Sequence, residues 1–214
     1  MRHLNGSILC VVDVETTGVI PRYHDLIEIC VLPLNSQLRP SQGILPFNLR
    51  MKPKRPDNVD LEALRKSRHY DRGFDFDDVC FNKERILDTI IDGVDPYFAA
   101  DLFDEWYQKL SLPPTKRIMP IAHNWVFDRE FIIDWLDIKG FEMYFDPRYR
   151  DTMAVSLFEN DKAEMRGEMH HPYPKNNLQY LCSQLKVERE KSHTALDDCV
   201  ATAEVYRKLI QGSV

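Results

Sequence analysis

Val11-Val12-Asp13-Val14-Glu15-Thr16-Thr17-Gly18 sets two carboxylates two positions apart at the end of an apolar run that is typical of a buried strand. Side chains alternate across a strand, so Asp13 and Glu15 should project from the same face and lie close enough to hold one divalent cation. Neither carboxylate suits the interior of an apolar sheet without such a partner. We therefore expect a cation site at the end of this strand.

Two further blocks supply the same kind of chemistry. The first is His123-Asn124-Trp125-Val126-Phe127-Asp128 and the second is His193-Thr194-Ala195-Leu196-Asp197-Asp198. In each, an aspartate falls in the first turn of an expected helix. If Asp128 and Asp198 converge on the strand pair, four carboxylates share a small volume and repel one another. Two divalent cations would relieve this repulsion, and ligands that are all oxygen suit Mg²⁺ or Mn²⁺.

A histidine adds what metal-bound carboxylates cannot supply. His193 lies five positions before Asp198 and titrates near neutrality, so it can accept the proton of an attacking water. Asp197 is better explained as part of a capping arrangement with Thr194, three positions earlier. We therefore include His193 in the candidate site and leave Asp197 out.

Hydrophobic patterning predicts an α/β domain with one mixed sheet, because strands come first and then alternate with helices. Strands are expected over residues 8–14, 26–34, 44–52 and 117–122. Helices are expected over residues 60–67, 99–110, 177–185 and from 196 onward, with another helix beginning near 127 and a short element over 151–157.

Two of these helices have an apolar face that can be read from residue spacing. The helix that begins near residue 127 repeats apolar residues at steps of four, four and three, which predicts an inward stripe of Phe127, Phe131, Trp135 and Ile138. The last helix is expected to bury one face, made of Leu196, Cys199, Val200, Ala203, Tyr206 and Ile210.

Length and composition narrow the class of protein. A chain of 214 residues fits a single domain over 1–214, with a longer excursion at about 55–97 that is dense in charges and aromatics. The five cysteines are scattered and form no Cys-x-x-Cys pair, which argues against a zinc ribbon or a secreted disulfide framework. With no leader-like segment and no membrane-length apolar window, we expect a soluble cytoplasmic protein without a membrane partner.

The net charge of −6 argues against a protein that neutralises many phosphates of a long duplex. A site that holds one or two terminal nucleotides through metal ions needs few basic contacts, because the cations supply the positive charge. The expected mode is local, metal-dependent binding of nucleic acid.

The three blocks resemble the exonuclease motifs of the DEDDh family of 3′→5′ exonucleases, a proofreading-subunit-like branch of the ribonuclease H-like superfamily. The family patterns Asp-x-Glu-Thr-Thr-Gly, His-Asn-x-x-Phe-Asp and His-x-Ala-x-x-Asp stand here at residues 13–18, 123–128 and 193–198, and the resemblance runs from about residue 7 to residue 210. It implies a ribonuclease H-like fold, with a central mixed five-stranded sheet flanked by helices. It also implies hydrolysis of terminal phosphodiester bonds with two divalent cations, Mg²⁺ or Mn²⁺.

The resemblance assigns roles to residues of this chain. Asp13, Glu15 and Asp198 would bind the first metal, with Asp13 shared by the second, and Asp128 would act through metal-bound water. His193 would be the general base. The resemblance also implies a set of substrate contacts: Thr16 and Thr17 at the terminal nucleotide, Val19 as an apolar wedge, Asn124 at the sugar-phosphate, and Glu62, in a segment similar to one of proofreading relatives.

Three readings of the function stay open from the sequence. The first is an exonuclease that acts on single-stranded or frayed DNA and releases nucleoside 5′-monophosphates, in proofreading, repair or replication. The second is an exoribonuclease that trims RNA 3′ ends or short oligoribonucleotides, because the catalytic blocks do not separate the two sugars. The third is a module that docks on a DNA polymerase or another replication protein, with catalysis secondary.

Overall fold

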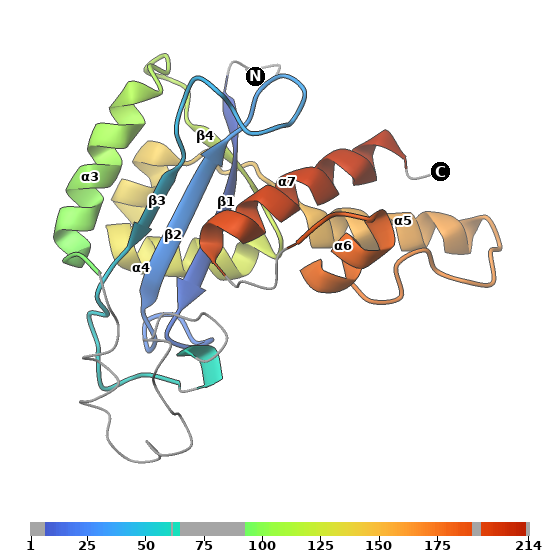
Figure 1. Ribbon diagram of the computed structural model, residues 1–214, viewed down its shortest axis with the longest axis horizontal. Coiled ribbons are helices and arrows are strands. Elements are labelled where there is room, and N and C mark those ends of the chain that lie inside the picture. Colours follow the sequence, from blue (N-terminus) through green and yellow to red (C-terminus); the bar gives the residue numbers. More distant parts are fainter. Residues whose placement is uncertain (1–6, 61, 65–92, 190–193, 213–214) are drawn as a thin grey trace.

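The computed structural model describes residues 7–60, 62–64, 93–189 and 194–212. Its centre is a five-stranded sheet in the order β3-β2-β1-β4-β5 (Figure 1). β1 pairs with β2 antiparallel and with β4 parallel, so the sheet is mixed, as expected. The strands are β1 (Ile8–Thr16), β2 (Leu26–Pro33), β3 (Phe47–Arg50), β4 (Ile118–Ala122) and β5 (Arg150–Asp151).

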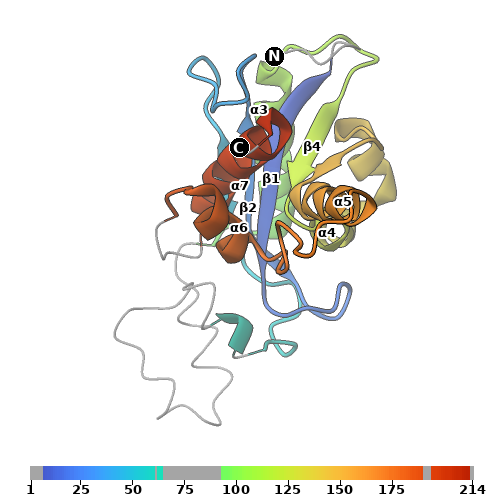
Figure 2. The same ribbon diagram turned by 90° about the vertical axis from the view of Figure 1, so that its right-hand side faces the viewer.

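Helices cover both faces of this sheet, which confirms the α/β class (Figures 1 and 2). α3 and α4 pack on one face and α7 crosses the other, where α5 and α6 lie against it. The bounds are α3 (Pro96–Lys109), α4 (Trp125–Tyr144), α5 (Thr152–Met165), α6 (Leu178–Leu185) and α7 (Ala195–Gln211).

The alternation of β1 determines which helix each of its side chains meets. Cys10, Val12 and Val14 belong to the core on the α3 and α4 side, whereas Leu9 and Val11 pack with residues of α7. Asp13 and Glu15 continue the odd-numbered series and are the only residues of β1 that are partly exposed. The two carboxylates therefore lie on the face that α7 covers.

The helix that begins near residue 127 departs from its expected face at Asp137. The backbone of Asp137 has φ 61° and ψ 173°, which breaks the helical phase of α4, and its Oδ1 accepts hydrogen bonds from the amides of Lys139 (2.7 Å) and Gly140 (2.8 Å). Phe131 and Trp135 are buried as predicted, but Ile138, just after the break, is 49% exposed. The predicted inward position of Ile138 is wrong, because the regular 3.6-residue period does not continue through Asp137.

The predicted face of the last helix is also wrong in part, since Val200 and Ile210 are 44% and 50% exposed. α7 packs on the sheet through Cys199 and its neighbours, but a second buried line faces α6. That line is made of Ala201, Val205 and Leu209. The buried arc therefore extends toward α6 and away from Val200, while Ile210 lies one residue before the helix ends.

Helix starts agree with the local sequence signals. Asn177 caps α6 by accepting a hydrogen bond from the amide of Tyr180 (2.9 Å), and Thr194 caps α7 by accepting one from the amide of Asp197 (3.2 Å). Of the helix expected over residues 60–67, the structure describes helical residues 62–64, and most of the excursion at 55–97 lies outside the described residues. In the described ranges, every helix is too short or too polar to span a bilayer.

Candidate metal centre

Three carboxylates from two elements meet at the end of β1. Asp13 and Glu15 come from the strand and Asp198 from the first turn of α7, and one oxygen of each lies within 4.8 Å of the others. This spacing suits a single ion that contacts all three side chains. The structure thus brings together three of the four predicted metal ligands.

Burial and mutual repulsion disfavour the ionised form of these carboxyl groups. Burial raises the pKa of Asp13 well above its usual range, and the nearby charges of Asp128, Asp198 and Glu15 raise it further. Burial and the charges of Asp198 and Glu28 raise the pKa of Glu15 to about 8. A divalent cation would supply the positive charge that offsets the repulsion between the carboxylates. The donor atoms of the cluster are all oxygens, which fit Mg²⁺ or Mn²⁺.

Asp128 lies beside this group. Its carboxylate is buried, and its Oδ1 accepts a hydrogen bond of 3.1 Å from the amide of Val14, between the two acidic residues of β1. Burial raises the pKa of Asp128, while the Val14 amide lowers it in part. Asp128 is therefore anchored to the strand that carries Asp13 and Glu15.

Asp151 positions the helix that carries Asp128. The amides of Asn124 (3.1 Å) and Trp125 (2.8 Å) donate to its carboxylate, which also accepts from the amide of Met153 (2.9 Å) at the start of α5. One buried side chain thus holds the first residues of two helices. Asn124 has the left-handed backbone conformation (φ 69°, ψ 54°), which turns the chain from β4 into α4.

Glu28 plays the corresponding part for α7. It stands opposite Glu15 on β2, and its Oε1 accepts a hydrogen bond of 3.2 Å from the amide of Ala195, the first residue of α7. Its Oε2 accepts from Nε of Arg50 (3.2 Å). Sequence reasoning missed both Glu28 and Asp151, although a carboxylate inside the apolar run 26–34 was the same signal that drew attention to Asp13.

Arg189 makes the closest contact with a candidate metal ligand. Its Nε donates to Asp198 Oδ1 (2.8 Å) and one terminal nitrogen donates to Oδ2 (2.6 Å), in a bidentate pair whose side chains are 8% and 10% exposed. The other terminal nitrogen donates to Oε1 of Gln179 on α6 (2.9 Å). Arg189 lies outside the three sequence motifs, so the sequence alone did not indicate it.

The predicted substrate-binding residues differ in how far their side chains are exposed to a ligand. Thr16 and Thr17 are buried; the hydroxyl of Thr16 donates to the carbonyl of Gly18 (2.6 Å), and that of Thr17 accepts from the amide of Asp25 (2.9 Å). Val19, at 68% exposure, is free to meet a ligand. Glu62 is exposed, and Asn124 is partly exposed. Their contacts with a substrate stay predictions.

The two histidines of the motifs differ in what the structure says of them. His193 lies outside the described residues, so its role as a base stays a prediction. Nδ1 of His123 shares a hydrogen bond of 2.8 Å with the hydroxyl of Thr152, and burial lowers the pKa of His123. His123 therefore links the end of β4 to the start of α5.

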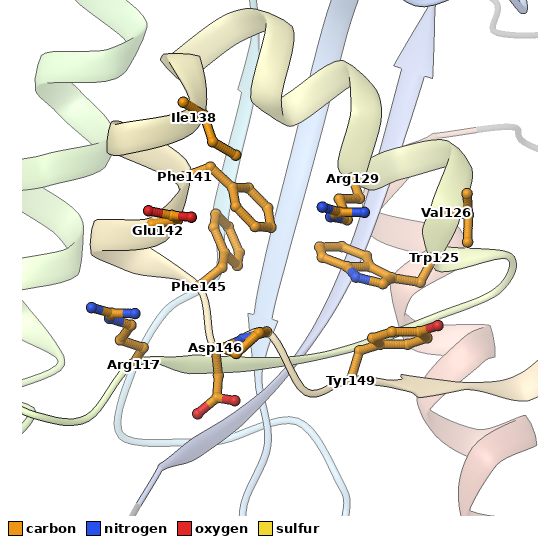
Figure 3. Close-up of a pocket in the computed structure, with 11 residues that line it drawn as sticks. Arg117, Trp125, Val126, Arg129, Ile138, Phe141, Glu142, Phe145, Asp146 and Tyr149 are labelled. Atoms are coloured by element: carbon orange, nitrogen blue, oxygen red, sulfur yellow. The ribbon is translucent and has the colours of Figure 1, made fainter.

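A cavity of about 320 Å³ lies elsewhere, against both halves of α4 (Figure 3). Aromatic side chains and two arginines line it, among them Trp125, Phe141, Phe145, Tyr149, Arg117 and Arg129. None of the clustered carboxylates reaches it. The acidic cluster and not this hollow is therefore the candidate metal centre, because carboxylate oxygens are the ligands that a divalent cation such as Mg²⁺ prefers.

Comparison with known proteins points to nucleases. Residues 102–206 match the RNase_T family model, described as an exonuclease. No curated protein matches the chain.

Three solved structures share the fold. The zinc-bound complex of E. coli ExoI with single-stranded DNA has a TM-score of 0.65 at 16% identity, covering 97% of this chain and 41% of that one. Cell-death related nuclease 4 (CRN-4) has a TM-score of 0.64 at 14% identity, covering 96% and 64%. A 3′-exonuclease that recognises the histone mRNA stem-loop has a TM-score of 0.62 at 14% identity, also covering 96% and 64%. The chain therefore spans less than two thirds of each of these proteins.

Proposed function

We propose that the chain is a metal-dependent 3′→5′ exonuclease that acts on single-stranded or frayed DNA and releases nucleoside 5′-monophosphates. The match of residues 102–206 to the exonuclease family model supports this proposal. The observation that carries the proposal is the convergence of Asp13, Glu15 and Asp198, with oxygens within 4.8 Å of one another. Exonuclease motifs that are far apart in the sequence thus supply one compact set of ligands.

Different residues of the chain would bind the metal ions and accept the proton. Asp13, Glu15 and Asp198 would hold one divalent cation, with Asp13 shared by a second, and Asp128 would act through bound water. The two cations, when bound, would supply the positive charge that stabilises the charge developing at the terminal phosphodiester during its hydrolysis. His193 accepts the proton of the attacking water.

Two further carboxylates position the helices that carry the proposed metal ligands. Asp151 fixes the start of α4 and so the place of Asp128, and Glu28 fixes the start of α7 and so the place of Asp198. Asp13 and Glu15 are partly exposed, which leaves the cluster accessible to a substrate.

RNA is the second candidate substrate. One protein with the same fold recognises the 3′ end of a histone mRNA stem-loop, whereas another was solved with a single-stranded DNA ligand. The hydrolysis is the same for either sugar, and discrimination depends on contacts with the 2′-hydroxyl. Docking on a polymerase is the remaining alternative; it rests on the excursion at 55–97, and no comparison favours it.

The test is the release of mononucleotides from 5′-labelled single-stranded DNA and RNA of equal sequence, with Mg²⁺, with Mn²⁺ and with EDTA. We expect a ladder that shortens from the 3′ end, needs a divalent metal and is lost in Asp198→Ala. Asp197→Asn is the matched control, because it changes the adjacent carboxylate, which lies outside the ligand group. No ladder on either substrate would refute the exonuclease proposal.

A further inference from the structure

Two kinds of cation can bind the carboxylate of Asp198: a divalent metal ion and the guanidinium of Arg189. Asp198 belongs to the three-carboxylate group that suits a divalent metal, yet both of its oxygens accept hydrogen bonds from Arg189. A bidentate guanidinium–carboxylate pair is among the strongest polar contacts in proteins, and this one is almost wholly buried. The arrangement places one positive charge directly on a carboxylate of the acidic cluster.

A metal ion and the guanidinium are poorly compatible on the same carboxylate. An Mg²⁺ ion lies about 2.1 Å from its ligand oxygen, which would put it within about 5 Å of the Arg189 nitrogens. Like charges repel strongly at that distance where water is scarce. Arg189 and the metal should therefore compete for Asp198.

We propose that Arg189 is the resident cation of the metal-free site, and that a divalent metal must displace it from Asp198 to bind. This inference rests on the proposed metal-dependent function. Gln179, an exposed residue of α6, helps to hold the guanidinium against Asp198, because its Oε1 accepts a hydrogen bond from Arg189. Arg189 thus stabilises the acidic cluster in the metal-free protein. Because the metal must displace it, Arg189 also lowers the affinity of the site for a divalent cation.

The competition can be measured without nucleic acid, so its outcome is separate from that of the exonuclease proposal. The probe is Mn²⁺ alone, with binding followed by the loss of the free-ion electron paramagnetic resonance signal. Arg189→Met keeps the length of the side chain but removes the charge. We expect it to bind Mn²⁺ at least about tenfold more tightly than wild type, because the metal no longer has to displace two charge-assisted hydrogen bonds from Asp198. We also expect it to melt at a lower temperature in EDTA.

Two further variants keep the test decisive if Arg189→Met folds poorly. Gln179→Ala changes an exposed residue and loosens Arg189 without removing it, so it should shift Mn²⁺ affinity in the same direction by a smaller factor. Arg207→Met is the matched control, because Arg207 forms a similar pair with Glu204 on α7 that involves no clustered carboxylate. It should leave Mn²⁺ affinity unchanged.

Two results would overturn the inference. Weaker Mn²⁺ binding by Arg189→Met would mean that the arginine positions Asp198 for the metal. An unchanged Mn²⁺ affinity, with equal losses of melting temperature in EDTA and in Mn²⁺, would mean that Arg189 serves the fold alone.

Discussion

His193 is the residue on which the proposed chemistry depends most and which the structure does not describe. In the proposed site the clustered carboxylates would be occupied by the bound cations, so a separate group must accept the proton of the attacking water. We predict that His193→Ala lowers the hydrolysis rate by about 10² to 10⁴, the usual contribution of a general base. The measurement is the single-turnover rate on a labelled oligonucleotide across pH 5 to 9.

The variant should differ from wild type in a second way. Its rate should lose the rise with pH that accompanies deprotonation of the general base, while its affinity for Mn²⁺ stays the same. A rate and a pH profile that match wild type would remove His193 from the mechanism.

At the scale of elements, Asp151 joins the starts of two helices. Its carboxylate accepts hydrogen bonds from Trp125 at the start of α4 and from Met153 at the start of α5. We predict that Asp151→Ala lowers the free energy of unfolding by about 2 kcal/mol, because two caps of about 1 kcal/mol each are lost. Activity should fall as well, since Asp128 lies in the first turn of α4.

Urea unfolding and the single-turnover rate measure the two effects. Asn177→Ala is the matched control, because it removes the single cap of α6, a helix that carries none of the clustered carboxylates. It should cost about 1 kcal/mol and spare the rate. Equal losses of activity in both variants would show that Asp151 has no special role in placing Asp128.

Elements that depend on local pattern could be predicted from the sequence, and those that depend on distant partners could not. β1 and the caps at Asn177 and Thr194 follow from alternation and from residue type. The break at Asp137 could not be foreseen, because neither glycine nor proline marks it.

The same division holds within the candidate site. Alternation along a strand placed Asp13 and Glu15 on one face, and the fold brought Asp198 to them. The partners of Arg189, Glu28 and Asp151 come from other elements, so no spacing in the sequence signals them.

For the molecule as a whole, the acidic cluster couples stability to pH. Glu15 has an ordinary pKa of 4.5, which the folded state raises to about 8. Between these values the folded chain keeps a proton that the unfolded chain has lost. Raising the pH through this window therefore lowers the free energy of unfolding, by up to about 1.4 kcal/mol per pH unit for one such group. The contribution is complete below pH 4.5 and gone above pH 8.

We therefore predict that the melting temperature of the protein in EDTA falls as the pH rises from 5 to 8, and that saturating Mg²⁺ flattens this dependence. Asp13 acts in the same direction, since burial and three neighbouring carboxylates raise its pKa as well. Asp13→Asn should accordingly be inactive, melt higher than wild type in EDTA at pH 8, and show a weaker dependence on pH. Asp146, whose pKa is lowered by Arg148, provides the contrast, because Asp146→Asn should leave the slope between pH 5 and 8 unchanged. If stability in EDTA instead rises across this window, the carboxylates are not held in the repulsive cluster on which metal binding depends.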